Sequence, residues 1–171
     1  AAAPGPTQGS TAPVRTRDRI LEAARTLFNA DAVSQVSTHR IAAELGISPG
    51  NLHYHFGAKQ QIVEALFRRC AAEMAPFGEA DATIEAIDDM WLALHLAFEV
   101  IERYRFVHRD IEYLVHEYPD LLPRARAMTA GYIDGARRMC RKLVSRRVLI
   151  ATGDEIDALA MQAVMNATCS R

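Results

Sequence analysis

Apolar residues recur every three or four positions along nearly the whole chain, and no stretch alternates between apolar and polar residues with a period of two. A period near 3.6 is that of one face of an α-helix, whereas a half-buried strand repeats every two residues. The pattern therefore predicts an all-α fold. With 171 residues, 50% of them hydrophobic and 24% charged, the chain can bury a core and is unlike collagen or wholly disordered proteins.

Three further features exclude whole classes of protein. The longest nearly continuous apolar run, from Met90 to Phe98, is far shorter than the roughly 18 residues that a membrane span requires. Residues 1–14 contain Pro and Gly but no apolar signal region, so we expect a disordered tail there, a cytoplasmic location and no membrane partner. The three cysteines are widely spaced without a CxxC pair, which argues against a disulfide framework and against a metal site.

The formal net charge of −1 hides an uneven distribution of charged side chains. Residues 71–100 contain no Lys or Arg, whereas basic side chains outnumber acidic ones in residues 101–150. A uniformly basic surface for nucleic acid is therefore absent. DNA binding is not excluded, because only the contacting surface has to be basic.

Helix start signals divide the first part of the chain into short segments. A first helix is expected from about Thr16 to Ala30, and a second begins after Ser37, whose side chain can cap it. Ser48 caps a third helix with Pro49 at its first position, where a missing N–H removes no helical hydrogen bond. A fourth helix begins near Lys59.

The rest of the chain predicts four longer helices. Asp81 caps the first, whose apolar residues form a stripe that we expect to be buried, and the second runs from Arg105 to Glu117. The third is long, and a capping box of Thr152 and Glu155 opens the fourth. The inward-facing residues expected are Ile84, Ile87, Trp91, Leu94, Phe98 and Ile101 in the first of these helices and Leu122, Ala125, Met128, Tyr132, Met139 and Leu143 in the third.

The segment from Ser37 to Lys59 carries the most specific signal. Two short helices joined by residues 45–48 (LGIS) have the spacing of a helix-turn-helix, in which the second helix enters the DNA major groove. A plain corner between two packed helices has the same spacing. The hydrogen-bonding side chains on or just beyond the second helix favour DNA binding, and they are Asn51, His53, Tyr54, His55 and Lys59.

These residues also carry a family resemblance. Residues 16–24 (TRDRILEAA), 41–48 (IAAELGIS) and 50–59 (GNLHYHFGAK) resemble the DNA-binding domain of TetR-family transcriptional regulators. Residues 104–106 (YRF) with Arg109 and Asp110 are similar to one branch of that family. The resemblance implies a helix-turn-helix DNA-binding domain over residues 15–60 and a helical regulatory and dimerisation domain over residues 61–171 that lacks its last helix.

The same resemblance implies a function and its partners. Members of this family are homodimeric repressors that bind a palindromic double-stranded DNA operator and leave it when a small-molecule inducer binds. By position, the expected contacts to base edges are Pro49, Gly50, Asn51, His53 and His39, and the expected contacts to phosphates are Thr38, Tyr54, His55 and Lys59. Ala32 stands where the family usually has glycine, so we expect a positive φ at this turn.

Large apolar side chains on three of the later helices predict where an inducer binds. They come from three directions, and His95 and Tyr132 add polar groups that can orient a ligand. The alternative is that these residues form a filled core. The expected pocket residues are Trp91, His95, Phe98, Tyr104, Phe106, Met128 and Tyr132.

Short matches to catalytic motifs fail on their context. Residues 46–50 have the GxSxG spacing of a hydrolase nucleophile elbow, but that motif needs a preceding strand and a helix is expected there. We therefore expect no enzyme, no catalytic residues and no cofactor. The alternative to a DNA-binding regulator is a helical binding or scaffold protein that has lost DNA binding.

Overall fold

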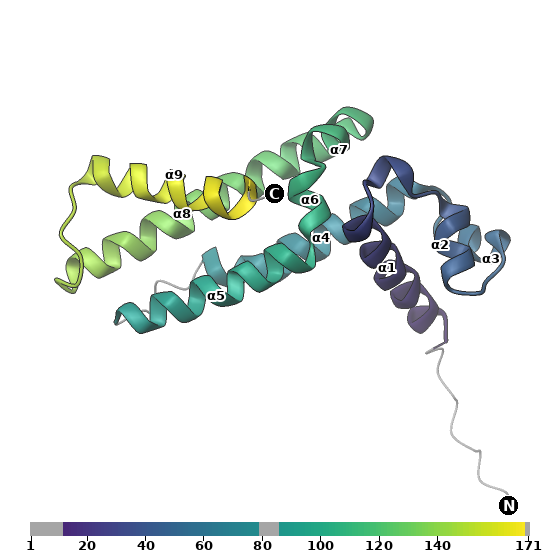
Figure 1. Ribbon diagram of the computed structural model, residues 1–171, viewed down its shortest axis with the longest axis horizontal. Coiled ribbons are helices and arrows are strands. Elements are labelled where there is room, and N and C mark those ends of the chain that lie inside the picture. The colour runs from purple at the N-terminus through teal and green to yellow at the C-terminus, as the bar shows by residue number, and fades with distance from the viewer. Residues whose placement is uncertain (1–11, 79–85, 170–171) are drawn as a thin grey trace, which may run out of the picture.

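The computed structural model describes residues 12–78 and 86–169, and every regular element in these ranges is helical (Figure 1). This confirms the all-α prediction. The elements form two units, with α1 to α3 at one end of the molecule and α5, α8 and α9 at the other (Figure 1). None of the helices in these two ranges combines the length and the apolarity needed to span a bilayer.

The N-terminal unit consists of α1 (Ala12–Ala30), the short 3-10 helix η1 (Val33–Gln35), α2 (Thr38–Glu44) and α3 (Pro49–His55). The two expected caps are confirmed, because Ser37 Oγ accepts from Arg40 N at 3.2 Å and Ser48 Oγ accepts from Asn51 N at 3.1 Å. Gly46 follows α2 with φ +63°, a conformation that favours glycine. The short helices pack through fully buried apolar residues, which include Ile20, Phe28, Ile41, Leu52 and Phe56.

Two expectations for this unit were wrong. Helix α1 begins at Ala12, so residues 12–14, expected in the tail, are helical. Pro13 falls in the first turn of α1, where its missing N–H is tolerated. Ala32 has φ −58° and ψ 142°, an ordinary extended conformation, because the chain enters η1 from an extended residue rather than through a left-handed turn.

The second unit contains α4 (Lys59–Gly78), α5 (Ile87–Arg103), α6 (Arg105–Arg109), α7 (Ile111–Glu117), η3 (Pro119–Leu121), α8 (Leu122–Ser145) and α9 (Gly153–Cys169). Helices α8 and α9 form an antiparallel hairpin, and α4 and α5 lie beside it (Figure 1). The capping box of α9 is confirmed, since Glu155 Oε2 accepts from Thr152 N at 2.7 Å and Thr152 Oγ1 accepts from Glu155 N at 3.3 Å.

The segment expected as one helix from Arg105 to Glu117 is two helices. The chain turns at Asp110, which has φ −102° and ψ 17°. The Asp110 carboxylate accepts a hydrogen bond from Val33 N at 2.8 Å, so the break places this side chain against the N-terminal unit. Tertiary contact has therefore overridden the helical pattern of the segment.

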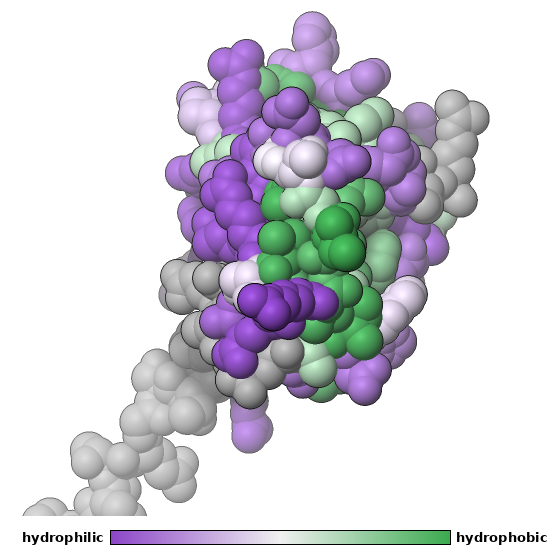
Figure 2. Space-filling model, turned by 90° about the vertical axis from the view of Figure 1, so that its left-hand side faces the viewer, coloured by the Kyte–Doolittle hydropathy of each residue, from purple (hydrophilic) through white to green (hydrophobic). Residues whose placement is uncertain are grey.

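The apolar stripe of α5 is less buried than expected. Ile87, Trp91 and Phe98 are 46%, 64% and 44% exposed, whereas Ile101 is buried. Leu122, expected to face inward from α8, is 37% exposed. The end of the molecule where α5 begins shows a patch of apolar side chains bounded by hydrophilic ones (Figure 2). The residue expected to cap this helix, Asp81, lies outside the described residues. The helical period located the stripe but not the elements that would cover it.

Candidate functional site

Helix α3 presents polar groups outward because its apolar residues are used for packing. Leu52 is 2% exposed, and Phe56, which follows the helix, is fully buried. Tyr54 is 85% exposed, and its ring meets that of His55 edge-on with centroids 5.3 Å apart. The residues expected to reach base edges, Pro49, Gly50, Asn51, His53 and His39, are all exposed. Thr38 and His55, expected at phosphates, are half-buried.

Arg17 of α1 holds the end of α3 in place. Its Nη1 donates to His55 O at 2.9 Å, and its guanidinium lies 4.1 Å from the centroid of the Phe56 ring. A cation over an aromatic face is an attractive contact. The sequence pattern does not reveal this positioning role, because it depends on a contact between α1 and the end of α3.

A shallow concavity lies between the start of α2 and the start of α3. It brings together six of the expected DNA contacts, which are Thr38, His39, Pro49, Gly50, His53 and Lys59. Asn51, Tyr54 and His55 do not line it. Helices α2 and α3 both begin at this concavity. The Arg40 and Asn51 N–H groups donate to the capping side chains of Ser37 and Ser48.

Lys59 connects this surface to the core. Its Nζ donates a hydrogen bond to Val33 O and lies 5.9 Å from the centroid of the Phe28 ring. The side chain is half-buried, and this burial lowers the pKa of Lys59. Lys59 therefore contributes to packing between α4 and η1, and its expected phosphate contact stays a prediction.

A dense set of hydrogen bonds joins the end of α1 to α6. Arg109 donates to the carbonyl oxygens of Phe28, Asn29 and Asp31 at 2.7, 3.0 and 2.9 Å, and pairs with Asp110 at 2.8 Å. These carbonyl oxygens lie at the C-terminal end of α1, where a positive charge is stabilising. Asn29, Arg109 and Asp110 together form the α1–α6 latch.

The latch also reaches α5. Asn29 Nδ2 donates to Arg103 O at 2.8 Å, and Asn29 Oδ1 accepts from Phe106 N at 3.0 Å. Arg103 is the last residue of α5 and Phe106 lies in α6. Directional hydrogen bonds therefore join the end of α5 and the start of α6 to the end of α1.

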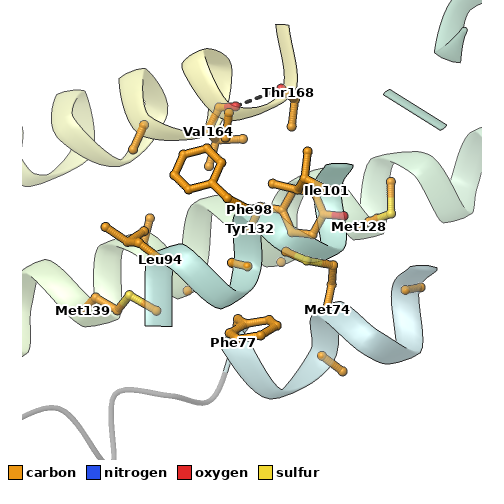
Figure 3. A pocket seen from close by; sticks show the side chains of 18 of the residues that line it. Met74, Phe77, Leu94, Phe98, Ile101, Met128, Tyr132, Met139, Val164 and Thr168 are labelled. Carbon is orange, nitrogen blue, oxygen red and sulfur yellow. Dashed lines mark hydrogen bonds between the residues drawn. The ribbon is translucent and has the colours of Figure 1, made fainter. Parts of the chain in front are cut away.

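An apolar cavity of about 510 Å³ lies among α4, α5, α8 and α9 (Figure 3). Of the residues expected to form a pocket, Phe98, Met128 and Tyr132 line it. Helix α4 contributes Met74 and Phe77, which the sequence argument did not single out. Gly131 and Gly135, one turn apart on α8, also line it and are the sequence signal that could have located it.

The other four expected pocket residues lie outside this cavity. Trp91 is 64% exposed, and the His95 side chain is 72% exposed with Nε2 3.5 Å from a Glu99 carboxylate oxygen. Tyr104 is buried and its hydroxyl donates to Glu73 Oε1 at 2.5 Å. Phe106 is fully buried against Phe28, with ring centroids 5.3 Å apart. Tyr104 and Phe106 thus pack the core between the two units.

Comparison with known proteins agrees with this architecture. Residues 20–66 match the family model described as bacterial regulatory proteins, tetR family, and residues 66–170 match one described as bacterial transcriptional repressor. A TetR-family transcriptional regulator from Marinobacter aquaeolei VT8 is 31% identical, with a TM-score of 0.83 over 90% of this chain and 76% of that chain.

Among curated proteins, the transcriptional repressor AcnR of Corynebacterium efficiens is 32% identical over 92 residues, which are 49% of each chain. The transcriptional regulator UidR of Escherichia coli K12 is 34% identical over 76 residues, 44% of this chain and 39% of UidR. The matched part of the chain thus spans about half or less of the length of these relatives. Regulators of this family bind DNA and are not enzymes. The chain belongs to the TetR family of bacterial transcriptional regulators.

Proposed function

We propose that the protein represses transcription as a homodimer on a palindromic operator and leaves the DNA when a small apolar molecule occupies the cavity. One observation carries this proposal: the helices around the cavity are joined directly to the DNA-binding unit. Helix α4 begins at Lys59, next to α3, and lines the cavity through Met74 and Phe77. Helix α5 lines it through Phe98 and ends at the α1–α6 latch.

In this proposal the exposed side chains of α2 and α3 divide into two groups with different effects. Pro49, Gly50, Asn51, His53 and His39 contact base edges and specify the sequence. Thr38, Tyr54, His55 and Lys59 contact phosphates and position the protein. The operator lies on the bacterial chromosome, so the cytoplasm is the proposed place of action.

Exposed apolar residues on α9 support the homodimer. Met161 and Met165, four residues apart on one face of this helix, are 44% and 53% exposed. A second copy that places the same hairpin of α8 and α9 against this face would cover them, as a two-fold symmetric interface requires. Two recognition helices would then meet half-sites about one DNA turn, roughly 34 Å, apart.

Release from DNA requires a ligand that prefers the DNA-incompetent conformation, because equal affinity for both conformations shifts no equilibrium. A ligand that pushes α5 away from α8 would strain the hydrogen bonds of the α1–α6 latch. This strain would change the orientation of α1 and α3. A hundredfold preference for the displaced form corresponds to about 2.7 kcal/mol.

A gel-shift titration with DNA flanking the protein's own gene, at low and moderate salt, tests the proposal. We expect one inverted repeat to be bound as a dimer, with affinity that falls as salt rises. Asn51→Ala should reduce the preference for this repeat over unrelated DNA, and Asp120→Ala, which removes an exposed carboxylate on η3, should not. Absence of binding to any fragment would favour the alternative, a helical binding protein without DNA affinity.

A further inference from the structure

Helices α2 and α3, which pack against each other at one end of the molecule (Figure 1), are rich in histidine. The same two helices carry one arginine, Arg40, and one acidic residue, Glu44, whose charges cancel. The net charge of this surface therefore depends on how many of its histidines are protonated. Residues 38–55 contain three of the six histidines of the chain, and these are His39, His53 and His55.

His39 and His53 line the same concavity, which holds little other charge. Both residues are exposed between the start of α2 and the start of α3. None of the described residues that line the concavity is acidic, and Lys59 is the one lysine or arginine among them. The half-buried Lys59 donates from Nζ to Val33 O, so its charge is turned partly towards the interior. An anion in this concavity would therefore be met chiefly by two imidazole rings.

Charged groups on the neighbouring elements do not take this role. Arg40 forms an ion pair with Asp31, which follows α1, at 2.6 Å, and η1 carries no charged side chain. Glu44 lies at the opposite end of α2 from His39. Glu117 of α7 interacts with the charge of Lys59 but does not line the concavity. The positive charge that can increase here is therefore that of the histidines.

His55 stands apart from the other two histidines. It is half-buried, its ring meets that of Tyr54 edge-on, and it does not line the concavity. Arg17 donates to the His55 carbonyl oxygen, so a permanent positive charge already lies at this end of α3. The next residue of α1, Asp18, is paired with Arg69 of α4. The proton-dependent charge of the concavity thus belongs to His39 and His53.

We propose that His39 and His53 bind DNA as imidazolium ions, so that the protein takes up protons as it binds. This inference rests on the proposed function and adds a dependence on pH at the same site. A histidine changes its charge between about pH 5 and 8, and a nearby phosphate favours the charged form. An imidazolium donates from both ring nitrogens, which suits phosphate oxygens and the N7 and O6 acceptors of guanine in the major groove.

Proton uptake makes the affinity for DNA depend on pH. By linkage, each proton taken up strengthens binding by up to about tenfold for each unit by which the pH falls. Each further phosphate that is neutralised also steepens the fall of log affinity with log salt by about 0.9. Glutamine can form hydrogen bonds but carries no charge, so the loss caused by replacing these histidines should appear at low pH and fade at high pH.

Fluorescence anisotropy with labelled DNA flanking the protein's own gene tests this role at pH 6 and pH 8 over a series of salt concentrations. The parent chain should bind about ten- to a hundredfold more tightly at pH 6, with a salt slope steeper by about one to two. The double variant His39→Gln/His53→Gln should bind as the parent does at pH 8 and lose most of the increase at pH 6. His95→Gln, at an exposed position of α5, is the matched control and should behave as the parent.

Calorimetry in two buffers of different ionisation enthalpy counts the protons directly. We expect an uptake of about one to two protons per chain for the parent and a smaller uptake for the double variant. Circular dichroism at both pH values confirms that the helices are retained.

Three results would overturn the role of the two histidines while DNA binding itself stands. The first is equal affinity and equal salt slope of the parent at pH 6 and pH 8. The second is an increase at pH 6 that the double variant retains in full, which would assign the protons to other groups. The third is an equal loss of affinity in the double variant at both pH values, which would make the histidines neutral contacts. If no fragment is bound at either pH, the proposed function fails and the inference fails with it.

Discussion

Gly50 is a residue whose small size matters more to the proposed partner than to the fold. Its φ lies outside the left-handed region, and an added Cβ would meet only Ser48 Oγ, at 4.0 Å. Because alanine favours a helix over glycine by up to about 1 kcal/mol, Gly50→Ala should not lower the melting temperature. The new methyl group would stand between α3 and the base edges, so operator affinity should fall roughly tenfold or more, about 1.4 kcal/mol.

Gel-shift titration and thermal unfolding of the same variant separate these two effects. Gly153→Ala makes the same change at the start of α9, where an added Cβ meets no atom within 4 Å, and should leave operator affinity unchanged. Equal operator affinity of Gly50→Ala and the parent chain would remove Gly50 from the proposed interface.

His108 makes the stability of the protein depend on pH in the acid range. Its pKa falls from a usual value of 6.5 to about 4 because the folded chain buries the ring. Between these two values the unfolded chain binds a proton that the folded chain does not, so the free energy of unfolding decreases as pH falls through this window. The loss approaches about 3 kcal/mol near pH 4, and nothing is lost to His108 above pH 6.5.

Urea unfolding at a series of pH values checks this expectation. His108→Phe should flatten the pH dependence between pH 6.5 and 4, whereas His95→Phe, at an exposed position of α5, should leave it as in the parent chain. If the free energy of unfolding changed with pH equally in the parent chain and in His108→Phe, other groups would govern stability in acid.

The break between α6 and α7 shows how one element takes its form from another. Helical periodicity alone would continue through Asp110, but its carboxylate meets Val33 N of the N-terminal unit and Arg109 closes the end of α1. Each of these bonds crosses more than 70 residues of sequence. Two short helices with this latch replace one longer helix without it.

Arg109→Lys tests the latch as a coupling element. A lysine retains the charge but cannot donate simultaneously to three carbonyls and a carboxylate in the planar arrangement of a guanidinium. We expect a loss of about 1–3 kcal/mol in the free energy of unfolding, and weaker release of DNA by a small apolar molecule that occupies the cavity. Arg124→Lys, exposed on α8, is the matched control and should behave as the parent chain. Unchanged stability and unchanged release would show that the latch bonds carry no coupling.

The two units of the molecule share one continuous apolar core. Some apolar side chains nevertheless remain on the surface of the molecule. The core runs from Ile20 in α1 through Phe106 in α6 to Ala125 in α8. Exposed apolar residues on α9 lie outside this core. Their exposure is the feature of the surface that a homodimer would explain.

Met165→Glu tests the proposed homodimer. An acidic side chain in the middle of a two-fold interface would face its own copy, and like charges brought together repel. Sedimentation at micromolar concentration should therefore show a monomer with its helical signal retained, and operator affinity should fall at least tenfold. Ile150→Glu makes the same kind of change at a 98% exposed position and should stay dimeric. A Met165→Glu chain that sediments like the parent would exclude this face.

Local chemistry made much of this protein predictable. Ser37, Ser48 and Thr152 cap the helices that follow them, as their side chains and the adjacent residues indicate, because a cap depends on groups within three positions of it. The helical period likewise located the apolar faces. The helix-turn-helix and its exposed polar side chains belong to this predictable part.

Contacts between distant segments decided the rest. The sequence could not show that Asp110 would reach Val33, that Ala32 would take an extended conformation, or that Trp91 would stay exposed on an apolar stripe. An apolar period states which face of a helix avoids water, but which element covers that face depends on how α4, α5, α8 and α9 pack. The cavity arises for the same reason, because Met74, Phe98, Tyr132 and Val164 come from four helices, and Gly131 and Gly135 mark only its α8 wall in the sequence.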